Sequence, residues 1–272
     1  MDVLMDANVL LLADSRLPAG GHAHSGGLEQ AAAAGAVADL DGLADFLRGR
    51  LATSGLVSAA LAAAACGYAT RGANSEDHDD REDHDDREDR EDREDREDRE
   101  EPTGTGQGRH GADGGWALLD AEADARTPSP AQRRASRAQG RALLRVARTT
   151  WPHPAFDSLA KVTGRSGSHG PHHPIVLGAA TAAAGGTPEQ AATIAAYGAV
   201  TGPAAAAVRL LGLDPLAVHR MLAWLAPDVG DVAARAAATS TAGWAGLPAV
   251  SAPVLDLYAE RHLRSELRLF ES

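Results

Sequence analysis

The chain has 272 residues, a formal net charge of −12 and a single cysteine, Cys66. That length suits one large domain or two small ones. Residues 76–101 hold 18 acidic residues and six arginines, so they carry the whole net charge and leave a neutral body. A neutral body gives no general case for nucleic-acid binding, and one cysteine excludes a disulfide or a Cys-based zinc site within one chain.

The N-terminus does not fit the pattern of a secretory signal peptide. Asp2 and Asp6 stand where a basic region would be expected. The longest apolar tracts, near 194–211, are mostly alanine and are interrupted by Gly202 and Arg209. These features predict a cytoplasmic protein without a membrane span.

The stretch 10–29, LLLADSRLPAGGHAHSGGLE, separates an apolar helix end from a short helix predicted at Leu28–Gly35. Its four glycines and one proline interrupt a helix. Three interpretations stay open. His22 and His24 could supply metal ligands. The glycine pairs could cradle a phosphate at the next helix N-terminus, although no P-loop pattern is present. The stretch could also form a tight interhelical crossing in which glycine lets two backbones touch.

The next element is a long helix predicted at Leu40–Tyr68. Its leucines and Phe46 recur at the three-and-four spacing of a buried helical stripe, and Asp39 or Asp41 can cap its start. Cys66 lies in this helix, where a buried apolar role is expected for a free cysteine.

A low-complexity insertion follows at 72–115. It collapses into a repeat of Asp, Arg and Glu and ends in a Gly-rich stretch. The repeat has no apolar side chain to bury, so we expect disorder, with a solvated charged helix as the alternative. His78 and His84 within it could bind a metal weakly.

Order is expected to resume at Trp116–Ala125, and the next helix is predicted at Pro130–Thr149 with Ser129 as its cap. One side of that helix carries five arginines at helical spacing. This pattern predicts a solvated face, a binding surface for an acidic partner such as the chain's own insertion, or a nucleic-acid-binding surface. The last interpretation lacks interleaved aromatic residues. The arginines are Arg134, Arg137, Arg141, Arg145 and Arg148.

Residues 151–174 form a loop-rich segment with four histidines, which are His153, His169, His172 and His173. They are a possible metal site, but no Cys or carboxylate joins them at regular spacing and no His-Glu-x-x-His pattern occurs. We favour a structural role.

The remaining sequence predicts helices and no strands. A capping box at Thr187–Gln190 opens one of them, and Gly198, Gly202 and Pro203 predict a kink or break within it. The chain is therefore predicted to be an all-α, single-domain bundle of roughly eight to ten helices. The predicted helices are 174–184, 188–211, 215–225, 228–241 and 253–267.

Four stretches, in order along the chain, resemble the UreF family of urease accessory proteins. They are SRLPAGGHAHSGGLE at 15–29, HHPIVLGAATAAA at 172–184, AAAVRLL at 205–211 and RLFES at 268–272. The resemblance implies an all-helical, usually dimeric, cytoplasmic accessory protein that is not an enzyme. It would bridge UreD (also called UreH) and the GTPase UreG and modulate GTP-dependent delivery of nickel to apo-urease. Nickel would be handled by the complex, with no cofactor held stably by this chain.

The resemblance also implies which residues meet partners. The first stretch and the chain's final residues would form a partner or dimer surface; the final residues could instead fold onto the chain's own core, and we favour docking. Arg209 and His173 would serve helix packing or a partner. The family usually has an aromatic residue where this chain has His22, which makes His22 and His24 weak metal candidates. The partner-binding candidates are His22, His24, Ser25, Gly27, Glu29, Arg268, Leu269 and Phe270.

Three rival functions remain. The main alternative is a helical metal-binding or regulatory protein that uses its His-rich loops directly. A DNA-binding regulator on the arginine stripe is the second, and it predicts salt-dependent DNA retention. A free-standing enzyme is the third, but the sequence offers no nucleophile–base pair and no paired carboxylates on one helix face, so we assign no catalytic residue.

Overall fold

The structure of the protein is a computed structural model that describes residues 7–14, 16–19, 24–82, 112–162, 170–240, 243–265 and 269–270. Within these ranges it is helical and contains no strand, which confirms the predicted all-α class. The helices are α1 Ala7–Ala13, α2 Leu28–Ala33, α3 Leu40–Arg50, α4 Leu56–Glu82, α5 Ala112–Ala125, α6 Pro130–Thr150, α7 Ala155–Ala160, α8 His173–Ala183, α9 Pro188–Leu211, α10 Pro215–Thr239 and α11 Pro253–Arg264. A 3₁₀ turn at Trp244–Gly246 precedes α11.

The helix predicted at Leu40–Tyr68 is present but longer than expected. A π-helical turn, Leu51–Gly55, joins α3 to α4 without a break, and α4 continues to Glu82. At the start of α3, Asp39 Oδ1 accepts a hydrogen bond from the Gly42 amide at 2.8 Å, as the capping pattern predicts. An established helix extends at little cost, since each further residue adds a hydrogen bond.

Helical structure extends into both ends of the insertion predicted at 72–115. Helix α4 enters it from one end and α5 begins inside it at Ala112. Residues 83–111, which hold most of the acidic repeat and His84, lie outside the described residues.

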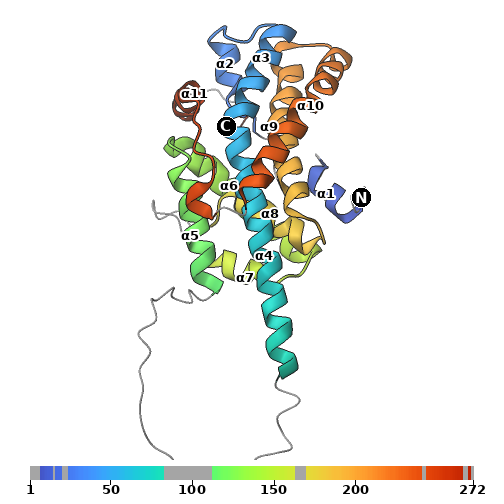
Figure 1. The fold of residues 1–272 in the computed structure, drawn as a ribbon. Coiled ribbons are helices and arrows are strands. Elements are labelled where there is room, and N and C mark those ends of the chain that lie inside the picture. The colour runs from blue at the N-terminus through green and yellow to red at the C-terminus, as the bar shows by residue number, and fades with distance from the viewer. Residues whose placement is uncertain are drawn as a thin grey trace, which may run out of the picture.

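Helix α4 is the axis around which the other helices pack (Figure 1). It lies against α8, α9 and α10, and its alanines from Ala59 to Ala65 are buried. Small side chains let helix backbones approach closely but bury little area each. One close approach is at Gly178 of α8, where an added Cβ would collide with the Ala62 carbonyl and the Cys66 amide of α4.

Two prolines lie inside helices where the sequence predicted an interruption: a kink or break near Pro203, and a boundary between two helices around Pro227. Helix α9 runs unbroken through Pro203, and the pair of helices predicted at 215–225 and 228–241 is one helix, α10, with Pro227 inside it. A proline cannot donate to the carbonyl four residues earlier. For Pro203 that carbonyl belongs to Ala199, and it accepts a hydrogen bond from Arg50 Nε at 3.0 Å instead. A tertiary contact thus replaces the missing helical bond.

Helix boundaries elsewhere follow the predicted caps. Ser129 Oγ accepts from the Gln132 amide at 3.2 Å, and Thr187 and Gln190 bond each other's amides in a reciprocal capping box. The loop-rich segment 151–174 contains one short helix, α7, and α11 ends at Arg264, three residues earlier than predicted.

Two stretches of the described chain are long and apolar enough to cross a membrane by length and composition alone. They are Leu40–Gly72, which covers α3 and most of α4, and α9. Both are core helices of this bundle, and a buried core helix passes the same test.

The α4–α8 contact yields a matched pair of substitutions. Gly178→Ala should lower the free energy of unfolding by about 1–3 kcal/mol, because the new methyl group overpacks the contact with α4. Gly198→Ala, at a helical glycine of α9 with nothing within 4 Å of the added Cβ, should be neutral or stabilising by up to ~1 kcal/mol. Urea unfolding of both variants is the measurement, and equal midpoints would contradict the close packing.

Candidate functional site

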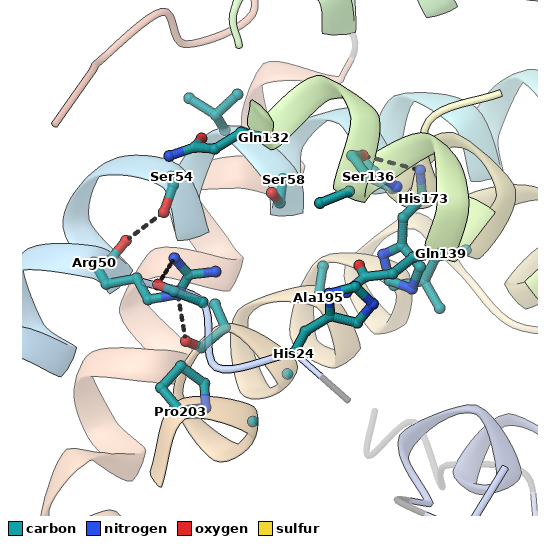
Figure 2. Close-up of a pocket in the computed structure, with 18 of the residues that line it drawn as sticks. His24, Arg50, Ser54, Ser58, Gln132, Ser136, Gln139, His173, Ala195 and Pro203 are labelled. Carbon is teal, nitrogen blue, oxygen red and sulfur yellow. Dashed lines mark hydrogen bonds between the residues drawn. The ribbon is translucent and has the colours of Figure 1, made fainter. Parts of the chain in front are cut away.

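A cavity of about 410 Å³ lies beside the described part of the 10–29 stretch. Its walls include residues of α1, the end of α3 and the π-helical turn, the start of α4, α6, the start of α8, α9 and α11. Figure 2 shows His24 near Gln139 and His173, with Arg50 and Ser54 at the other side of the cavity. Segments far apart in the sequence therefore meet around one concave surface, which is typical of binding sites.

Two of the predicted site histidines, His24 and His173, line this cavity together. Burial and, to a smaller extent, the neighbouring His24 together lower the pKa of His173 to about 4. His173 is therefore neutral at pH 7. The described residues bring no group of three or more His, Cys, Asp or Glu side chains together as metal ligands. His22, the other weak metal candidate, lies outside the described residues, as does His169.

Arg50 is a site residue that sequence reasoning missed. Its guanidinium donates from Nη1 to the Gly26 carbonyl at 2.8 Å and from Nε to the Ala199 carbonyl at 3.0 Å. Burial lowers the pKa of Arg50 to about 10, so it stays charged at neutral pH. One arginine thus fastens the glycine loop to α9. Its place inside the helix predicted at Leu40–Tyr68 gave no signal of that contact.

Ser25 and Gly27 have local structural roles. Ser25 is fully buried, and its Oγ accepts a hydrogen bond from the Glu29 amide at 3.3 Å at the start of α2. Gly27 has φ +91°, which L side chains rarely adopt, and an added Cβ there would touch Leu255 and Tyr258 of α11. This geometry matches the interpretation of the loop as a tight interhelical crossing.

Glu29 connects this loop to the last described residues of the chain. Its two carboxylate oxygens accept the backbone amides of Leu269 at 2.8 Å and Phe270 at 3.2 Å. Phe270 is buried, with the Arg209 guanidinium 4.5 Å above its ring, whereas Leu269 is 78% exposed. Two predicted stretches and Arg209 are therefore brought together, with Phe270 folded onto the chain's own core. Arg268 lies outside the described residues.

A buried ionic cluster joins α5, α6 and the residues before α8, and the sequence analysis did not find it. Arg137 Nη2 lies 2.8 Å from Asp120 Oδ2 and 3.0 Å from Asp124 Oδ2, and its Nη1 donates to the Gly170 carbonyl. The His172 ring lies between Asp124 and Ser136, at 2.8 Å and 3.0 Å, and its backbone amide donates to Asp120. The sequence signal was Asp120 and Asp124, spaced four apart on one side of an apolar helix, so the expectation that no helix face carries paired carboxylates was wrong.

The protonation states in this cluster follow from its geometry. Burial lowers the pKa of His172, which keeps its ring neutral. Burial alone would raise the pKa of Asp124, but hydrogen bonds from His172 and Arg137 outweigh it and lower that pKa. The cluster thus sets the Arg137 guanidinium and a neutral imidazole against the carboxyl groups of Asp120 and Asp124, with Arg133 Nε 4.0 Å from Asp124 Oδ1.

The cluster corrects the prediction of a continuous arginine face on α6. Arg137 is 1% exposed and belongs to the core, while Arg134, Arg141, Arg145 and Arg148 are exposed. Arg148 pairs with Asp157 at 2.6 Å. Four of the five predicted arginines are therefore exposed on α6, and the fifth, Arg137, is buried in the core.

Comparison with known proteins decides the family. A family model described as UreF matches residues 37–226, which is more than half of the chain. The chain belongs to the UreF family. It is 40% identical over 266 residues to a protein of Mycolicibacterium vanbaalenii named "Urease accessory protein UreF", with 98% of each chain covered. Proteins of the same name from Mycobacterium sp. strain JLS and Mycobacterium tuberculosis strain H37Rv are 39% and 37% identical over 97% and 98% of each chain. The resemblance inferred from four short stretches is thereby confirmed.

The buried cluster in this UreF chain predicts unequal effects of two arginine substitutions on the same helix. Arg137→Leu should lower the free energy of unfolding by about 3–5 kcal/mol, because it leaves two buried carboxylates without their cation. Arg148→Leu should cost about 0–1 kcal/mol, because both partners of that pair are exposed. Chemical unfolding at pH 7 distinguishes them, and similar losses would contradict the assignment.

Proposed function

We propose that this UreF-family chain is a non-enzymatic scaffold that bridges UreD (UreH) and the GTPase UreG and modulates GTP-dependent delivery of nickel to apo-urease. Family membership over nearly the full chain carries the proposal. The relatives are named urease accessory proteins. We expect an accessory protein to act through surfaces that bind other proteins. We assign the working compartment of this complex to the cytoplasm.

The surface formed by the loop and the chain's last residues supports this role. Leu269 is 78% exposed although Glu29 fixes its backbone, so its side chain is held out toward solvent. Helix α11 adds further exposed apolar side chains, Val254 and Leu257, at 56% and 62%. Exposed apolar residues on a rigid support are typical of protein interfaces. We assign this surface to UreD or UreG.

A homodimer is part of the proposal, through the outer face of α10. Leu216 and Trp224 there are 80% and 70% exposed. If two copies of α10 pair antiparallel about Trp224, Arg220 of one copy lies opposite Asp228 of the other, because both are four residues from the axis. Arg220 already lies over the Trp224 ring, 5.8 Å from its centroid. The face is therefore self-complementary in charge.

We assign nickel to the complex and not to a stable site in this chain. Two histidines, His24 and His173, share the cavity, and they are the observation that favours the alternative of direct metal binding. Two ligands make an incomplete site for nickel or zinc.

The test is urease activity in cells that hold the structural subunits, UreD, UreG and nickel. Adding the chain should activate urease, and Leu269→Asp should reduce activation at least about tenfold by placing a charge in the interface. Leu118→Asp, at a 49% exposed position of α5, is the control and should retain activity. A folded, cognate-matched chain that leaves urease inactive would refute the proposal.

A further inference from the structure

His262 of α11 is buried beside the contact between Glu29 and the chain's last residues. Its side chain is 3% exposed, and its Nε2 lies 3.0 Å from the Phe270 carbonyl oxygen. A carbonyl oxygen can only accept a hydrogen bond, so Nε2 must carry the proton. The ring's tautomer is thereby fixed by Phe270.

The other ring nitrogen has no hydrogen-bond partner. His262 Nδ1 is buried and lies 3.6 Å from Glu29 Oε2. In the neutral ring Nδ1 has a lone pair and faces the negative carboxylate, which is an unfavourable arrangement. A proton taken from solvent onto Nδ1 would turn it into a donor and make His262 a cation beside Glu29.

We propose that His262 is a proton-operated latch for residues 269–270. In the protonated state the imidazolium bonds the Phe270 carbonyl through Nε2 and pairs with Glu29 through Nδ1. Glu29 holds the amides of Leu269 and Phe270 at the same time, so one carboxylate couples the histidine to the backbone. Loss of the Nδ1 proton restores the facing lone pairs and loosens the segment.

The other charged groups on the elements around the latch include three arginines and Glu260. Arg209 of α9 lies over Phe270, and Arg261 and Arg264 occupy the last turn of α11. Glu260 of α11 points to α6, where it accepts from the Ser129 hydroxyl and the Ala131 amide, and these bonds lower its pKa. Gln30 of α2 donates to Ser265 Oγ at 3.2 Å without any charge.

These contacts determine in which direction pH changes the docking of residues 269–270. Protonation of His262 adds a favourable pair to the docked state, so docking should be stronger on the acid side of neutrality. It weakens as pH rises through the range in which histidine loses its proton. The inference concerns contacts within the chain and does not depend on the proposed partners.

Hydrogen exchange of the Leu269 and Phe270 amides tests the latch, with rates corrected for intrinsic exchange at each pH. Protection should fall at least about tenfold between pH 5.5 and pH 8.0 in the native chain. His262→Gln should remove that dependence, since a glutamine amide can still donate to Phe270 but does not titrate. His219→Gln, at an exposed histidine of α10, is the control and should keep it.

Two results would overturn the latch. One is protection in the native chain that does not change with pH. The other is an unchanged pH dependence in His262→Gln. Should that variant fold poorly, ring nitrogen shifts of the native chain replace it. They should show a proton on both nitrogens of His262 at pH 5.5 and on Nε2 alone at pH 8.0, and a proton on Nδ1 alone at pH 8.0 would contradict the assignment.

Discussion

The close approach of α8 to α4 is the constraint on which the rest of the bundle depends. Only a glycine at 178 leaves room for the Ala62 carbonyl, and the alanines of α4 let α9 and α10 approach it as well. An alanine bundle gains its stability from many short contacts and not from a few large side chains. Because α8 begins at the cavity and α9 lines it, the same approach positions His173 and Ala195 at the candidate site.

Polar contacts fix the elements that this small-residue core cannot hold. The Arg137 cluster ties α5 and α6 to the segment before α8, and a second glycine, Gly140 of α6, lies too close to the Pro171 carbonyl to accept a side chain. Arg50 ties the glycine loop to α9, and Glu29 ties it to the chain's last residues. Buried charge of this kind is costly unless it is fully paired, which makes the arrangement sensitive to the loss of any member.

Local signals predicted the helices well. The capping box at Thr187 and the Gly212 turn, with φ +64°, give α9 the bounds that the sequence predicted, Pro188–Leu211. Such signals act within a few residues of the chain and can be found by spacing. Of the kink or break expected near Pro203, no break occurs, and the helix boundary expected around Pro227 is absent. Compensation by Arg50, 149 residues from Ala199, is invisible to any local pattern.

The candidate site was predictable in its parts but not in its connections. The loop, Arg209, His173 and the final residues were all singled out from their resemblance to UreF proteins, yet their spacing does not indicate that Glu29 bonds residues 240 positions away. Arg137 illustrates the opposite failure. It fits a surface stripe by helical spacing, but its neighbours on α5 place it in the core. A helical wheel reports which residues share a face, and not what covers that face.

Membership of the UreF family and the joined loop and chain end together support a protein that works by contact with partners. The proposed bridge is tested most directly by size-exclusion chromatography with light scattering on the purified chain mixed with its cognate UreD and UreG. The account predicts that UreG elutes with UreD only when the chain is present, in a particle that holds two copies of the chain. A UreD–UreG complex that forms without the chain, or a folded chain that elutes apart from both proteins, would contradict it.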